Sequence, residues 1–171
     1  MVSGAEQPVE DRLVQLFEYF DLSEAHVAAC RPEDWRGFVG RYPDLISSLT
    51  LVCPPTFDTT PLRSIASRVV VLMGDQGPAV AGVRQSLAAI SDATLITLRD
   101  YVTLAWSDVI ADRCGEIGVA IGEHLRRAGA HRDIRAVALP EGEGSIGGLS
   151  YRIRGAGPPL LLLPLSLAPS Q

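Results

Sequence analysis

The sequence predicts an α/β fold: a mostly parallel sheet with helices on both faces and an antiparallel hairpin at the C-terminal end. Strand-like and helix-like segments alternate along most of the chain. A β-branched run over residues 68–73 is typical of a central parallel strand that is buried on both faces. After Gly129 the pattern changes to short strands separated by glycine-rich turns, which predicts the hairpin.

The first half of the chain is expected to supply two helices and two strands. Strands are expected over residues 25–30 and 48–52, because prolines close both runs. One helix is expected over residues 35–42, before Pro43. Another is expected from Asp11, where apolar residues recur at helical spacing: Leu13, Leu16, Phe17 and Phe20.

The second half continues the alternation after a loop over residues 56–61. Strands are expected over residues 68–73 and 93–98, and helices over residues 79–90 and 108–127. A turn over 74–78 follows the central strand. One face of the last helix is apolar, through Ile110, Cys114, Ile117 and Ile121.

The last segment is expected to form strands over residues 135–139, 149–154 and 160–164, with a glycine-rich loop over residues 141–148. Residues 1–10 are expected to be a flexible leader, and residues 11–171 a single domain.

Composition excludes several classes of protein. The 171 residues are 47% hydrophobic and 20% charged, with a mean hydropathy of +0.19, which predicts a globular chain with a sizeable core. A net charge of −5 leaves no basic stripe for nucleic acid, and no apolar run is long enough to cross a bilayer. All 15 cationic residues are arginine. The lack of lysine excludes a Walker lysine, a Schiff-base lysine and a Ser-x-x-Lys nucleophile.

The three cysteines, Cys30, Cys53 and Cys114, are widely spaced and match no zinc or disulfide pattern. Cys53 and Cys114 lie in apolar runs and are expected to be buried. The acidic, polar start of the chain is not a signal peptide. These features predict a cytoplasmic protein with no metal site and no cofactor.

Several segments together resemble the α/β-hydrolase family. Residues 25–52 are similar to that family's stretch from the nucleophile strand to the next strand, residues 68–78 to its acid-bearing strand, and residues 99–127 to its histidine loop and last helix. Residues 151–164 (YRIRGAGPPLLLLP) are similar to its opening hairpin and oxyanion strand. Residues 11–128 thus match the family's C-terminal half and residues 133–171 its N-terminal part. This rotated order implies a circularly permuted relative or a piece of a longer chain.

The resemblance also implies that the catalytic positions are vacant. The family's nucleophile elbow is Gly-x-Ser-x-Gly, but here the serine position falls on Arg31, or on Cys30 with a shift of one residue. The acid position falls near Gly77 and the histidine position at Tyr101, and Ser166 follows the oxyanion strand. Triad members act as a unit, so the loss of all three leaves little beyond binding.

Weak catalytic candidates remain, each beside a structural interpretation. Cys30 could be a nucleophile, but His26 lies too far along the same strand to serve as its base, so Cys30 is otherwise a strand-end residue. Asp75, at the carboxyl end of a strand, could supply an acid or be a turn residue. Ser166 could be an exposed nucleophilic hydroxyl or a loop residue.

Other residues could bind a ligand rather than react. Tyr101, Trp106 and Asp75 could line the former active-site cleft; otherwise Tyr101 packs against Trp106. His124 and His131 lie near charged residues and are expected on the surface.

The sequence Gly-x-Gly-x-x-Gly over residues 142–147 lacks a following helix, so it is expected to be a hairpin loop rather than a phosphate cradle. Ser145, within it, is not in a true elbow motif, since residue 143 is glutamate.

Three functions follow from these features. The first is a catalytically degenerate domain that acts as a binding, scaffolding or assembly module, as a homo-oligomer or beside a fused domain. The second is an esterase-like hydrolase with relocated groups. The third is a small-molecule binder that uses the former cleft. Neither nucleic acid nor a membrane is expected as a partner.

Overall fold

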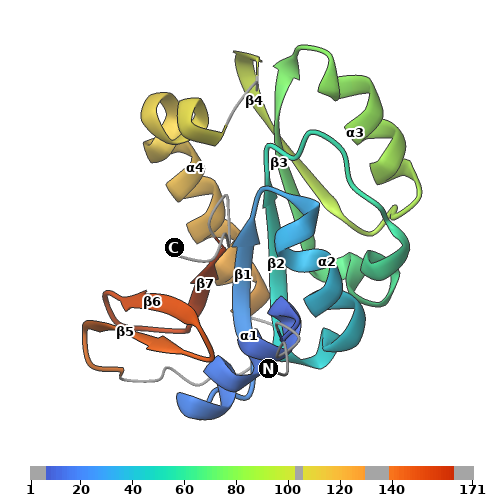
Figure 1. Cartoon of the computed structure of the whole chain (residues 1–171). Helices are drawn as coiled ribbons and strands as arrows, with labels where there is room; N and C mark the ends of the chain where they lie inside the picture. The colour runs from blue at the N-terminus through green and yellow to red at the C-terminus, as the bar shows by residue number, and fades with distance from the viewer. Residues whose placement is uncertain (1–6, 103–105, 130–138, 164–171) are drawn as a thin grey trace, which may run out of the picture.

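The computed structural model describes residues 7–102, 106–129 and 139–163. Five parallel strands form its main sheet, in the order β4-β3-β2-β1-β7 (Figure 1). Their bounds are β1 (Ala25–Ala29), β2 (Ile46–Val52), β3 (Val69–Gln76), β4 (Thr94–Val102) and β7 (Leu160–Leu162). The predicted parallel α/β architecture is confirmed, and β7, from the end of the chain, pairs with β1, from its beginning.

Helices cover both faces of this sheet (Figure 1). Helix α4 (Trp106–Gly129) covers one face. The other face carries three α-helices and two short 3₁₀ helices: α1 (Val9–Tyr19), α2 (Pro32–Arg41), η1 (Pro43–Leu45), η2 (Thr60–Arg68) and α3 (Ala79–Ala88). Helix α2 begins three residues before the predicted start, because Pro32 is well suited to the first helical turn. The 3₁₀ helix η2 was not predicted.

The core has two layers because side chains alternate along the strands. Facing α1, α2 and α3, the core is apolar; it includes Val27 of β1, Leu49 of β2 and Val71 of β3. Facing α4, a smaller apolar cluster includes Val70, Leu72 and Leu98. On the side of the sheet that faces α4, the part near β1 is polar, and the site described below lies there.

The C-terminal hairpin is formed by β5 (Gly142–Ile146) and β6 (Leu149–Ile153), which pair antiparallel. The predicted hairpin is therefore confirmed, but the loop expected over residues 141–148 is wrong. Gly144 lies in a strand opposite Tyr151, and a Cβ there would lie 2.4 Å from the tyrosine Oη. Glycine at this position lets the tyrosine ring lie over the strand without moving aside. Only residue 139 of the strand expected over 135–139 lies among the described residues, and it is not in a strand.

Arg12 of α1 holds the hairpin turn. The Arg12 side chain, 8% exposed, donates Nε–H to the Gly147 carbonyl at 2.7 Å and a second N–H to the Gly148 carbonyl. On the same side, Phe20 meets Tyr151 of β6 edge-to-face, with 5.1 Å between ring centroids. The hairpin is therefore fixed to a helix more than 130 residues earlier in the chain.

Helix α4 is kinked at Arg113, whose φ of −129° and ψ of 18° are not helical. The residues before and after the kink therefore do not share one continuous face. Ile117 is buried as expected, but Cys114 is exposed, so its predicted burial is wrong. Cys53, by contrast, is buried as predicted. None of the helices in the described ranges has the length and apolar character needed to cross a membrane.

Replacing Arg12 by methionine keeps most of the side-chain bulk but leaves two glycine carbonyls without their donor. We expect Arg12→Met to lower the free energy of unfolding by about 1–3 kcal/mol in urea titrations. Arg36→Met is the control, since Arg36 makes an exposed ion pair with Asp58 at 3.3 Å and should change stability little. Equal effects of the two substitutions would contradict this role of Arg12.

Candidate functional site

Polar side chains gather at both ends of the sheet. The candidate residues Cys30 and Asp75, predicted from the sequence, lie at the carboxyl end. Cys30 follows β1 there and is 6% exposed, with its Sγ 3.7 Å from the Cys53 carbonyl, to which it donates. Arg31 has φ −90° and ψ 138°, an ordinary extended conformation. The strained strand-to-helix turn that exposes a nucleophile in an elbow motif is therefore not formed at Arg31.

Asp75 and Tyr101 meet at this same end, where β3 and β4 slip in register between Gly74 and Gln76. The Asp75 Oδ1 accepts the Tyr101 backbone N–H at 3.2 Å. Backbone N–H groups of Tyr101 and Asp100 lower the pKa of the Asp75 carboxyl. Asp100 has a φ of 54°. The carboxylate thus secures an irregular piece of β4.

Tyr101 is 7% exposed, and the Arg113 guanidinium lies 5.3 Å from its ring centroid. Trp106 begins α4, but its side chain lies outside the described residues, as do Ser166 and His131. The structure therefore brings Asp75 and Tyr101 together, through the tyrosine backbone. The ligand-binding role predicted for them stays a prediction.

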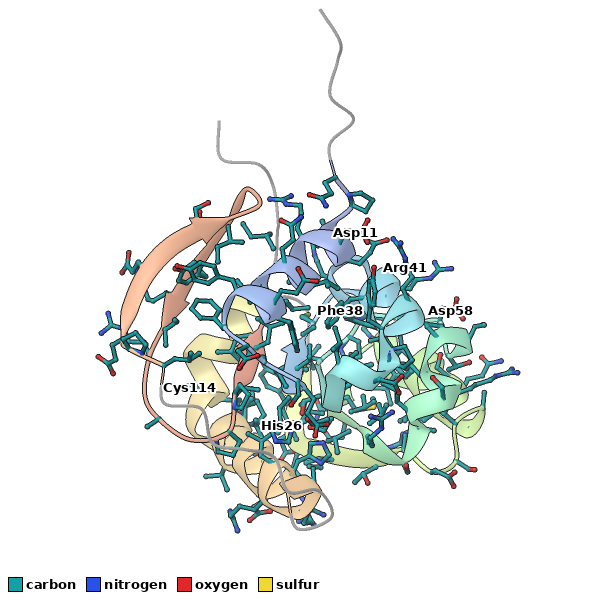
Figure 2. The ribbon with its side chains drawn as sticks, turned by 90° about the horizontal axis from the view of Figure 1, so that it is seen from below. Asp11, His26, Phe38, Arg41, Asp58 and Cys114 are labelled. Atoms are coloured by element: carbon teal, nitrogen blue, oxygen red, sulfur yellow. The ribbon has the colours of Figure 1, made fainter. Side chains whose placement is uncertain are left out.

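The amino end of the sheet holds the two histidines of the described chain. His26, near the start of β1, is 1% exposed, and its Nδ1 lies 2.7 Å from Ser48 Oγ of β2. His124 of α4 is 7% exposed, so the surface position predicted for it is wrong. Figure 2, which views the molecule from below, shows His26 between the sheet and α4.

Burial and neighbouring charges set the protonation of both imidazoles. Burial lowers the pKa of His26, with Glu24 opposing the change. Burial, together with the nearby His26 and Arg127, lowers the pKa of His124 to about 4, against a hydrogen bond with the Arg68 backbone. Both side chains are therefore neutral at pH 7.

A cavity of about 620 Å³ opens beside His124. It lies between the starts of β2 and β4, the end of η2 and the last turns of α4. Its described lining residues are mostly hydroxyl-bearing or cationic, and none is acidic: Ser47, Ser64, Ser67, Arg68, Thr94, His124, Arg127 and Ala128. Two buried polar atoms on this wall, Ser47 Oγ and His124 Nε2, have no hydrogen-bond partner among the described residues.

The described residues do not group three histidine, cysteine or acidic side chains as a metal ion would need. At the carboxyl end, the side chains of Cys30 and Asp75 are engaged by backbone groups, and neither described histidine is present. At the amino end, a buried Ser–His pair lies beside a polar cavity. The polar groups at the carboxyl end therefore have a structural role, whereas the cavity at the amino end can bind a polar molecule.

The fold is similar to that of the crystal structure of a predicted CIB-like hydrolase from Thermoplasma acidophilum, with a TM-score of 0.54 and 13% sequence identity. The similarity covers 74% of this chain and 62% of that one, so the chain spans less than two thirds of that protein's length. At this identity the likeness concerns the fold alone, which is α/β-hydrolase-like. No protein-family model and no curated protein matches the sequence.

Sequence reasoning missed the amino-end cavity. The sequence predicts a strand that begins at Ser48, and it assigns no role to Ser47. A signal was available: two adjacent serines lie near the start of a mostly apolar strand, and His26 lies near the start of the strand before it. Buried polar residues in such a run need partners, which indicates a polar cluster.

We expect the buried histidines to make stability pH-dependent. Their pKa values in the folded protein lie below the unfolded value of 6.5, so the unfolded chain binds more protons as the pH falls. Stability is therefore full above pH 6.5 and is lost toward pH 4, by up to about 1.4 kcal/mol per pH unit for each histidine.

Urea unfolding across this pH range measures the slope, and His124→Gln should flatten it. The wild type and the variant share every carboxylate, so the difference between their slopes reports His124. An unchanged slope in His124→Gln would show that His124 is not buried in its neutral form.

Proposed function

We propose that this chain is a catalytically degenerate α/β-hydrolase-like domain that acts by binding and assembly. One observation carries the proposal: the polar groups at the carboxyl end of the sheet are used within the fold. The Cys30 thiol contacts the Cys53 carbonyl, and the Asp75 carboxylate accepts backbone N–H groups of β4. The described histidines lie at the opposite end. Neither described histidine is therefore placed to act as a base for a thiol or hydroxyl at the carboxyl end.

The order of the segments supports descent from a rotated α/β hydrolase. Strand β7, which resembles the family's oxyanion strand, pairs in parallel with β1, which resembles its nucleophile strand. The hairpin that resembles the family's opening strands comes just before β7 in this chain. The positions that correspond to the family's triad are Arg31, Gly77 and Tyr101. On this proposal the fold has kept its binding surfaces and lost its catalytic residues.

Chemical labelling tests the absence of an activated nucleophile. We expect iodoacetamide to modify the exposed Cys114 as an ordinary thiol and the buried Cys30 and Cys53 far more slowly. The variant Cys114→Ser should remove nearly all labelling of the folded protein. A fluorophosphonate probe should label no serine. Rapid modification of Cys30, or of any serine, would instead support the esterase-like alternative.

Assembly is proposed to use the edge strand β4. This strand runs over nine residues and exposes Leu95 and Val102, each about two fifths accessible, whereas the opposite edge strand, β7, has three residues. The outer backbone groups of a long edge strand are a template for pairing with another chain. A second copy of this chain, paired through β4, is the partner we propose.

Sedimentation velocity at micromolar concentration tests this assembly. We expect the wild type to sediment as a dimer and Leu95→Lys to sediment as a monomer, because a charge on an edge strand opposes pairing. Val119→Lys is the matched control: Val119 is exposed on α4 rather than on the edge strand, and its substitution should leave the dimer intact. A monomeric wild type would contradict assembly through β4.

A further inference from the structure

The cavity at the amino end of the sheet has the composition of a ligand site. It has a volume of about 620 Å³, within the range of small-molecule pockets. Its described lining carries the side chains of four serine or threonine residues, two arginines and one histidine. Guanidinium and hydroxyl groups donate hydrogen bonds to phosphate and carboxylate oxygens. The lack of a described acidic residue on the wall leaves this part of the cavity with positive charge.

Two atoms on the wall point to a missing partner. Ser47 is 1% exposed, and its Oγ has no hydrogen-bond partner among the described residues. The same holds for the Nε2 of His124, which is 7% exposed. A buried polar atom left without a partner destabilises the folded state, so such atoms are uncommon in folded proteins. Two of them on one cavity wall indicate that something polar fills the space.

Local features of the chain hold these groups in place. Ser47 precedes the residue that pairs with His26, and the register between β1 and β2 shifts at this point. The shift places Ser47 in a bulge, and bulges re-aim side chains in this way. Arg68 ends η2 and donates to the carbonyls of Pro43 and Ile46, which fixes its guanidinium at the cavity wall. Arg127 lies near His124, in the last turn of α4.

We infer that this cavity binds a small molecule through a phosphate or carboxylate group, with Ser47 and Arg127 donating to its oxygens. The cavity is larger than a single oxyanion, so a larger body carries the group. His124 lines the same cavity, so its ring signal should respond when a ligand enters. The inference is independent of the proposed function, because the cavity is at the opposite end of the sheet from the vacant triad positions and away from the outer edge of β4.

Binding of inorganic phosphate, and separately of acetate, tests this inference. Each is titrated by NMR into ¹³C-labelled protein carrying His131→Gln, which leaves the ring signals of His26 and His124. Sodium chloride keeps the ionic strength constant. We expect a saturable shift of the His124 signal with phosphate, acetate, or both. The two titrations distinguish a phosphate site from a carboxylate site, and a failure of both to saturate would overturn the inference.

Paired variants locate the site. Arg127→Gln should weaken binding about tenfold or more, since it removes a charge-assisted donor. Arg126→Gln removes the same charge from the neighbouring exposed residue, which does not line the cavity, and should change affinity about twofold or less because salt screens it. Equal losses in the two variants would indicate general attraction to a basic surface and would overturn the assignment.

Ser47→Ala gives a second, independent readout. If the Ser47 hydroxyl serves the ligand, its removal weakens phosphate or acetate binding about tenfold, yet does not lower the thermal midpoint of the free protein. The unpartnered hydroxyl contributes nothing to the empty fold, so methyl in its place is neutral or stabilising. A lowered midpoint with unchanged binding would show that Ser47 is structural and would overturn its role.

Discussion

The parallel pairing of β1 with β7 is the constraint on which the rest of the fold depends. All five residues of β1 are buried, so its backbone groups need partners on both sides. Strand β2 supplies one set. Strand β7 supplies the other, with hydrogen bonds of 2.9 Å from His26 to Pro159 and from Leu163 to Ala28. The backbone pairing of β1, which lies between β2 and the edge strand β7, is therefore completed by residues more than 130 positions later.

The pairing of β7 with β1 explains why the β5–β6 hairpin is held to α1. Strand β7 has only three residues and could not hold its register through its own contacts alone. The hairpin that precedes β7 positions this strand. Arg12 fixes the hairpin turn, and Phe20 packs on Tyr151. Leu149 of the hairpin belongs to the same core cluster as Leu13 and Phe17. The same arrangement sets the contrast between the two ends of the sheet. Ligand sites of open α/β sheets gather at the carboxyl end, but here two buried polar atoms without a described partner, Ser47 Oγ and His124 Nε2, lie together at the amino end.

Much of the fold could be predicted from the sequence because the central strands are buried on both faces. A continuous apolar run such as residues 69–73 is typical of a strand buried on both faces and of few other elements. The amino-end cavity could not be predicted in this way. His124 is buried where α4 packs against β2, and neither this packing nor the kink of α4 at Arg113 has a local signature in the sequence. Strand β5 was missed because glycines weaken strand propensity, while the need for Gly144 arises only across the hairpin, at Tyr151.

The late arrival of β7 has a consequence for folding during synthesis. Until residue 163 has left the ribosome, β1 presents an unpaired parallel edge, flanked by the apolar strand β2. Such an edge is open to pairing with another nascent chain, and parallel pairings between distant segments form slowly. A chain that stalled before β7 would expose this edge for as long as the stall lasted. Efficient production of this domain is therefore expected to depend on rapid completion of translation or on a chaperone that covers β1.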